Sequence, residues 1–189
     1  QLRGNKGTNE IIEASLDGHP VSPLVAPGIF AATAITHLFG GSGGREGAAL
    51  QLGGSAASFL AKWCHLKESN RKILVTAGMS SVFAGLFGTP LTATLFCMEF
   101  ASVGTIFSPA LLPCFLAAFI ASRISLLLGV HAETFILTES FTITLGNCWQ
   151  YLVLAVLVSL LGIAMCWVFH NAEHLAAHHF PNPFVRIVA

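Results

Sequence analysis

Charged side chains are almost absent from most of this 189-residue chain. Three stretches of more than 40 residues carry only one or two charges each: residues 18–61 (Arg45 and Glu46), 73–122 (Glu99) and 140–180 (Glu173). Soluble domains average about 25% charged residues, whereas this chain has 10% charged and 54% hydrophobic residues and a mean hydropathy of +0.73. A soluble protein of this size could not bury so much apolar surface, so we predict an integral membrane protein.

The composition also excludes several other classes of protein. Nine Lys and Arg residues balance nine Asp and Glu residues, which leaves no basic surface for nucleic acid, and the hydrophobicity excludes disorder. The five cysteines follow no metal-binding or disulfide spacing. Because no nucleophile–base pair or cofactor motif appears either, we expect no enzyme, no cofactor and no metal. The chain begins at Gln1 without a signal-peptide pattern, so we expect part of a longer protein.

The hydropathy pattern divides the chain into a polar start and a membrane region. The predicted parts are a polar segment at 1–22, membrane helices over 23–128 with breaks at 40–48 and 88–90, and a last membrane helix at 149–170. Only residues 106–128 and 149–168 are long and continuous enough to cross a bilayer as ordinary helices. Within the polar start, Glu10 to Leu16 predicts a short helix that ends at Asp17-Gly18-His19-Pro20.

The two breaks place irregular backbone between apolar segments. In lipid, unpaired backbone groups are costly, so irregular backbone at depth must line a cavity inside the protein. Broken helices of this kind mark the substrate site in transporter folds. A solvent loop between two spans remains the alternative for residues 40–48.

The glycine run from Gly40 to Gly47 matches neither common nucleotide motif. No Gly-Lys-Ser/Thr follows it, and Glu46 stands where a dinucleotide fingerprint needs its third glycine. The run instead leads into a helix predicted to start near Glu46 or Gly47. Free N–H groups and the helix dipole make such a start an anion site. Glu46 can fill that site as a carboxylate and leave it when protonated, which would make it a gate. Glu46 capping its own helix, paired with Arg45, is the alternative.

Two linked motifs resemble the CLC chloride channel and transporter family. Residues 44–48 (Gly-Arg-Glu-Gly-Ala) and 51–54 (Gln-Leu-Gly-Gly) are similar to its gating-glutamate motif. Residues 77–91, which include Phe-Gly-Thr-Pro-Leu, and 95–99 (Leu-Phe-Cys-Met-Glu) are similar to its next block. The resemblance implies an all-α polytopic fold with broken re-entrant helices and two inverted repeats per subunit. It also implies a homodimer with one anion pore per subunit, of which this chain would be the first repeat.

The resemblance also implies functional residues. Glu46 is the expected gate, and the expected anion-binding residues are Gly4, Asn5, Lys6, Gly44, Arg45, Gly47 and Ala48. Asn5 stands where most members have serine, and Ala48 stands where they have proline. Both departures are similar to the fluoride-exporting branch, although Lys6 is not typical of it. An ordinary turn is the alternative for residues 4–7.

Glu99 is the expected residue of the proton pathway. It matches the first of two adjacent acidic residues in relatives that exchange anions for protons, and Phe100 occupies the second position. The positive residues between Lys62 and Lys72 indicate a cytoplasmic connection, which places Glu99 near the cytoplasmic side. An ionisable residue in a membrane segment suggests a function. A structural hydrogen bond at the water boundary is the alternative.

Together these features predict transport of a small inorganic anion, fluoride or chloride, across a membrane. We expect proton-coupled exchange gated by Glu46, with the anion, protons and the lipid bilayer as partners, in a bacterial inner (plasma) membrane. A passive anion channel of the same family is one alternative. A transporter half for another substrate and a non-transporting fragment or membrane subunit are the others.

Overall fold

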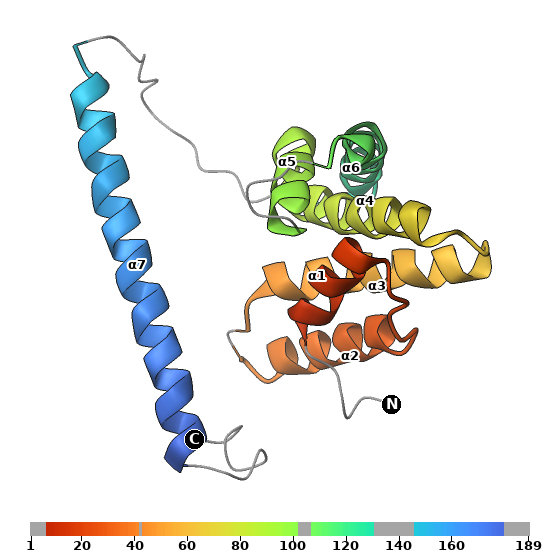
Figure 1. Ribbon diagram of the computed structural model, residues 1–189, viewed down its shortest axis with the longest axis horizontal. Coiled ribbons are helices and arrows are strands. Elements are labelled where there is room, and N and C mark those ends of the chain that lie inside the picture. Colours follow the sequence, from red (N-terminus) through yellow and green to blue (C-terminus); the bar gives the residue numbers. More distant parts are fainter. Residues whose placement is uncertain (1–6, 42, 102–106, 131–145, 180–189) are drawn as a thin grey trace. The chain divides into compact units, whose positions relative to one another are not determined.

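The computed structural model describes residues 7–41, 43–101, 107–130 and 146–179, and within these ranges the regular structure is entirely helical (Figure 1). The helices are α1 (Thr8–Asp17), α2 (Val25–Leu38), α3 (Arg45–Trp63), α4 (Glu68–Phe87), α5 (Pro90–Ala101), the 3₁₀ turn η2 (Ser108–Ala110), α6 (Leu111–Leu127) and α7 (Cys148–His179). The chain forms two compact units, residues 1–134 and 135–189. All of the predicted site residues belong to the first unit.

Helix α4 is the centre of the first unit. It packs against α1, α3, α5 and α6, while α2 lies along α3 and α5 contacts α6 (Figure 1). The main apolar cluster draws on five of these helices, α1 to α5, and on the segment after α1, and its members are Ile11, Ala14, Val21, Val25, Leu50, Val75, Met79 and Cys97. Because Ile11 and Ala14 are almost fully buried, the short helix α1 is part of this core.

Helices α3 and α4 cross at unusually close range because their contact is made of small residues. A Cβ atom added to Gly53 would overlap the carbonyl oxygen of Gly78. A Cβ added to Gly78 would lie 2.5 Å from both the Gly53 carbonyl oxygen and the Ala57 Cβ. Small residues that let two helix backbones approach in this way are typical of membrane helix packing. This crossing fixes α3, and therefore its first turn, against α4.

Glycines in the left-handed conformation end two of the helices. Gly18 ends α1 with φ 74°, and its N–H donates to the Ala14 carbonyl over 3.0 Å. Gly88 ends α4 with φ 69°, and α5 begins two residues later at Pro90. Glycine adopts this conformation without the steric penalty of a Cβ atom. A short helix thus precedes Gly18, and Gly88 and Thr89 separate α4 from α5, while Pro90, which was expected in the break at 88–90, is already the first residue of α5.

Two predicted boundaries are wrong by a few residues. Helix α3 begins at Arg45, so residues 45–48 are helical and the irregular stretch at 40–48 is shorter than expected. The extended backbone of Gly44 lets the helix start at the next residue. Helix α4 begins at Glu68, which leaves only residues 64–67 as the connection that was expected to span 62–72. An acidic residue in a first helical turn is favourable, and Glu68 occupies that position.

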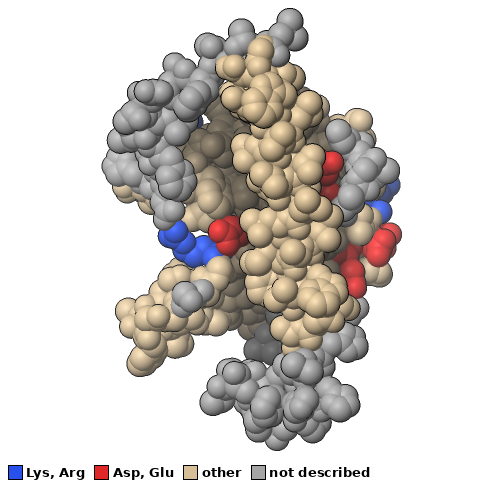
Figure 2. All heavy atoms as spheres, turned by 90° about the vertical axis from the view of Figure 1, so that its left-hand side faces the viewer, with Lys and Arg blue, Asp and Glu red and all other residues tan. Residues whose placement is uncertain are grey.

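Within the residues that the structure describes, two helical segments are long and apolar enough to cross a membrane. They are Ser108–Leu127, in the first unit, and Cys148–Ala172, in the second, in agreement with the two predicted spans. Every side chain from Trp149 to Ala172 is exposed at the surface of the chain. On the face drawn in Figure 2, charged side chains occupy only a few separate spots. Residues 131–145, which separate the two spans in the sequence, lie outside the described residues.

Candidate functional site

The start of α3 holds the residue predicted to be the gate. Gly44 precedes the helix in an extended conformation, φ −60° and ψ 134°, and Glu46 lies in the first turn. The Glu46 side chain is exposed at the surface of the chain. Its Oε2 atom lies 3.3 Å from the position that a Cβ atom on Gly44 would take. The carboxylate is therefore folded back beside the start of its own helix, where the first-turn N–H groups and the positive end of the helix dipole lie.

The start of α1 meets the start of α3. Thr8 is the first residue of α1, and its Oγ1 atom lies 3.3 Å from the position of a Cβ added to Gly47. The amide Nε2 of Gln51, one turn further along α3, donates a 2.9 Å hydrogen bond to the same Oγ1 atom. The first turns of two helices, distant in sequence, are thus held together by Thr8.

Glycine precedes both of these helices. Gly7 is the N-cap of α1 and Gly44 is the N-cap of α3. Neither residue has a side chain that could accept a hydrogen bond from the first-turn N–H groups, as a serine, threonine or aspartate cap would. Two positive helix ends without side-chain caps can bind an anion without any lysine or arginine. The Glu46 carboxylate is itself an anion of the right charge to compete at the α3 start.

The structure brings one half of the predicted anion site together. Gly44, Arg45, Glu46, Gly47 and Ala48 form the N-cap and first turn of α3. The other half, Gly4, Asn5 and Lys6, lies outside the described residues. These three precede Gly7 directly in the sequence, so their chain leads into the α1 start. The anion-binding roles of both halves stay predictions.

Glu99 lies elsewhere in the fold. It occupies the last turn of α5 and is exposed within the chain. The next residue, Phe100, packs against the apolar cluster that includes Ile11. Glu46 and Glu99 thus lie on different helices, α3 and α5.

Sequence reasoning missed the two residues that join the helix starts. Gln51 belongs to the recognised motif, but its partner Thr8 is 43 residues away, and no local pattern links them. Gly7 before Thr8, with Glu10 in the first turn, is a helix-start signal that could have singled out Thr8. Within the described ranges, no group of three or more His, Cys, Asp or Glu side chains could hold a metal ion.

Comparison with known proteins identifies the family of this chain. A protein-family model described as "Voltage gated chloride channel" matches residues 1–189. The chain belongs to this family. The resemblance carried by the two motifs is therefore confirmed, and so is the all-helical fold expected of the voltage-gated chloride channels.

Two members of the family illustrate the likeness. The chain is 33% identical over 166 residues to a "Chloride/fluoride channel protein" of Pseudomonas syringae pv. tomato, which covers 87% of this chain and 37% of that protein. The crystal structure of a CLC-type fluoride/proton antiporter superposes with a TM-score of 0.87 at 36% identity, covering 96% of this chain and 46% of the antiporter chain. The chain thus spans less than half the length of either relative, as expected of a single repeat.

Proposed function

We propose that the protein containing this chain transports a small inorganic anion, fluoride or chloride, across a membrane, and that Glu46 gates the transport. The dehydrated anion would be held by backbone N–H groups at the starts of α1 and α3. The Glu46 carboxylate would compete for the same place and withdraw when it is protonated. In this mechanism a change of charge on one side chain opens and closes the site.

The observation that carries this proposal is the junction of the two helix starts. Thr8 lies beside Gly47 and accepts a hydrogen bond from Gln51, while the Glu46 carboxylate folds back toward Gly44. An anion at this junction would face two positive helix ends at once. The printed names of the two relatives, a chloride/fluoride channel and a fluoride/proton antiporter, support the same substrate class.

Proton-coupled exchange and passive conduction are both supported by specific features. The likeness to a fluoride/proton antiporter supports exchange, with Glu99 as the residue of the proton pathway. Phe100 beside Glu99 supports the channel alternative, because a phenyl ring cannot carry a proton. A non-transporting fragment or membrane subunit is the remaining alternative.

The protein is proposed to work as an integral protein of a bacterial inner (plasma) membrane, and as a homodimer in its full-length form. The two apolar helical segments and the bacterial origin of the relative support the location. The homodimer follows from the family resemblance alone. Cross-linking of the full-length protein in its native membrane would test the dimer.

Reconstitution of the full-length protein into liposomes tests the proposed function. Vesicles loaded with potassium fluoride or potassium chloride are diluted into anion-free buffer, and anion release and internal pH are followed together. We expect release of anion with movement of protons. Release without proton movement would support the passive channel. Absence of release for both anions, from protein that is folded and inserted, would contradict anion transport.

A further inference from the structure

The far end of α1 is held by a single cationic side chain of α4. Arg71 is partly buried, and its Nη1 atom donates a 2.8 Å hydrogen bond to the carbonyl oxygen of Gly18, the residue that ends α1. Its Nη2 atom lies 3.4 Å from the carbonyl oxygen of Leu66 in the α3–α4 turn. A guanidinium at the C-terminal end of a helix is favourable because that end carries the negative part of the dipole.

The same helix end also touches the α4 backbone. A Cβ atom added to Gly18 would lie 2.8 Å from the carbonyl oxygen of Glu68 and 3.3 Å from its Cα. Three residues later, the Val21 N–H donates a 2.9 Å hydrogen bond to the buried Ser58 hydroxyl on α3. The chain segment after α1 is therefore packed directly onto α3 and α4, and no larger residue fits at position 18 without displacing it.

Helix α1 connects this attachment to the proposed anion site. It has 10 residues, so it is about 15 Å long. Its first residue, Thr8, lies beside Gly47 and is hydrogen-bonded to Gln51. The residue that ends it, Gly18, lies beside the Glu68 backbone and is hydrogen-bonded to Arg71. Because a short helix moves nearly as a rigid rod, a displacement at its end is passed to Thr8 at its start.

We infer that Arg71 is a positioning residue for anion binding: it fixes the end of α1 and thereby sets where the α1 start stands against α3. This inference rests on the proposed function. The buried Nε atom of Arg71 has no hydrogen-bond partner among the described residues, so the guanidinium is held by its two terminal nitrogens. A lysine could still donate to the Gly18 carbonyl, but it could not reproduce the fork that spans Gly18 and Leu66.

Anion release from liposomes containing the full-length protein tests the inference. The fluoride concentration that gives half-maximal flux is measured for the wild type, Arg71→Gln, Arg71→Lys and Gly18→Ala, together with maximal flux and thermal stability. We expect Arg71→Gln to raise the half-saturating concentration about tenfold, since misplacing a charge-binding donor weakens binding by that order. Arg71→Lys should restore part of the affinity. Gly18→Ala should act like Arg71→Gln without changing any charge.

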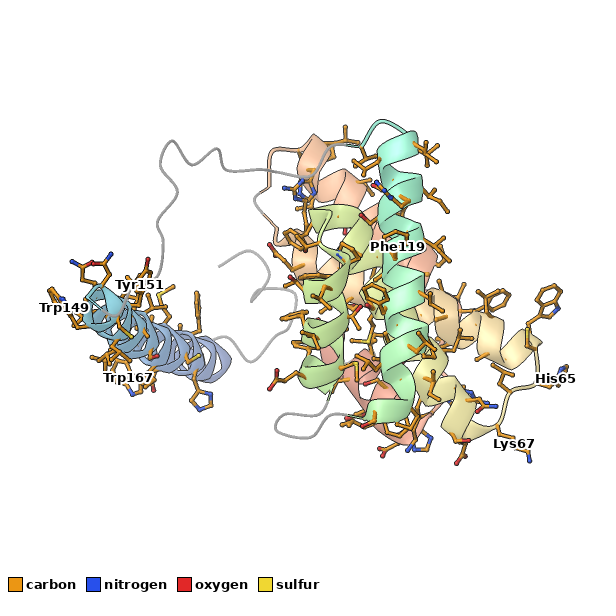
Figure 3. All side chains as sticks on the ribbon, turned by 90° about the horizontal axis from the view of Figure 1, so that it is seen from above. His65, Lys67, Phe119, Trp149, Tyr151 and Trp167 are labelled. Carbon is orange, nitrogen blue, oxygen red and sulfur yellow. The ribbon has the colours of Figure 1, made fainter. Side chains whose placement is uncertain are left out.

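Lys67→Gln is the matched control for charge. Lys67 is exposed at the α3–α4 turn and points away from the helices (Figure 3), so its loss should leave the half-saturating concentration unchanged. If Arg71→Gln does not fold, Arg71→Lys and Gly18→Ala carry the test. Lower thermal stability with unchanged half-saturation in these variants would overturn the inference and leave Arg71 a purely structural residue. Absence of flux in the wild type would instead contradict the proposed function.

Discussion

The amide of Gln51 donates a 2.9 Å hydrogen bond to the hydroxyl of Thr8. This bond joins the first turn of α1 to α3 at the point where Gly47 has no side chain to keep the two helices apart. Because the Thr8 oxygen accepts from Gln51, its own O–H can donate to another group. The pair therefore holds the helix starts together.

Removal of this bond should weaken both stability and anion binding. We expect Gln51→Leu, which keeps the side-chain volume, to lower the free energy of unfolding by about 1 kcal/mol and to raise the half-saturating fluoride concentration. Thr8→Val should have a similar effect. The double variant should be no worse than either single one, because both changes remove the same bond. Strictly additive effects in this double-mutant cycle would show that the two residues act independently.

A larger residue at the α3–α4 crossing should destabilise the protein. Gly53→Ala places a methyl group in overlap with the Gly78 carbonyl oxygen and 2.8 Å from its carbon, so the two helices must separate. We expect a loss of about 1–3 kcal/mol of stability, measured by thermal unfolding in detergent.

A second alanine substitution controls for helix propensity. Gly28, in α2, has nothing within 4 Å of an added Cβ atom, so Gly28→Ala should leave stability unchanged or raise it by up to about 1 kcal/mol. Equal unfolding temperatures for Gly53→Ala and Gly28→Ala would contradict the close crossing.

Replacement of Ala48 by proline should reduce the preference for fluoride. The family resemblance implies proline at this position in most chloride-handling members, and proline has no backbone N–H to donate from the first turns of α3. We expect the wild type to release fluoride faster than chloride. In Ala48→Pro the ratio of the fluoride rate to the chloride rate should be closer to one. The ratio is measured with ion-selective electrodes on the same vesicles. Equal rates in the wild type would remove the reason for assigning the fluoride branch.

Substitution of Glu99 should affect proton movement more than anion movement. The Phe100 side chain packs into the core and cannot carry a proton, so Glu99 must act alone if the protein exchanges anions for protons. We expect Glu99→Gln to abolish proton uptake driven by an anion gradient while anion flux continues. Proton uptake that survives the substitution would eliminate Glu99 from the pathway.

Much of the fold could be predicted from the sequence because its signals are local. Gly18 and Gly88 end helices through their left-handed backbone, and the long apolar segments identify the two candidate spans. The start of α3 at Arg45 was missed by one or two residues because the glycine run before it gives no side-chain cap signal. Glycine is compatible both with continued irregular backbone and with a helix start.

The candidate site was only partly predictable. Glu46 and its neighbours are adjacent in the sequence, so a motif could identify them. Thr8 and Arg71 act through contacts 43 and 53 residues away, and such contacts depend on how α1 packs between α3 and α4. The sequence of a short helix does not show which distant residues hold its two ends, because such contacts follow no periodic pattern.

The pH dependence of anion flux through the Glu46→Gln variant tests the account most directly. Fluoride release is measured for the full-length wild type and for Glu46→Gln across a range of pH values, with Glu68→Gln, an exposed carboxylate at the α4 start, as the control. A glutamine cannot change its charge, so flux in Glu46→Gln should persist and be the same at every pH, while the wild type and the control vary with pH. A Glu46→Gln variant that keeps the wild-type pH dependence would contradict the assignment of Glu46 as the gate.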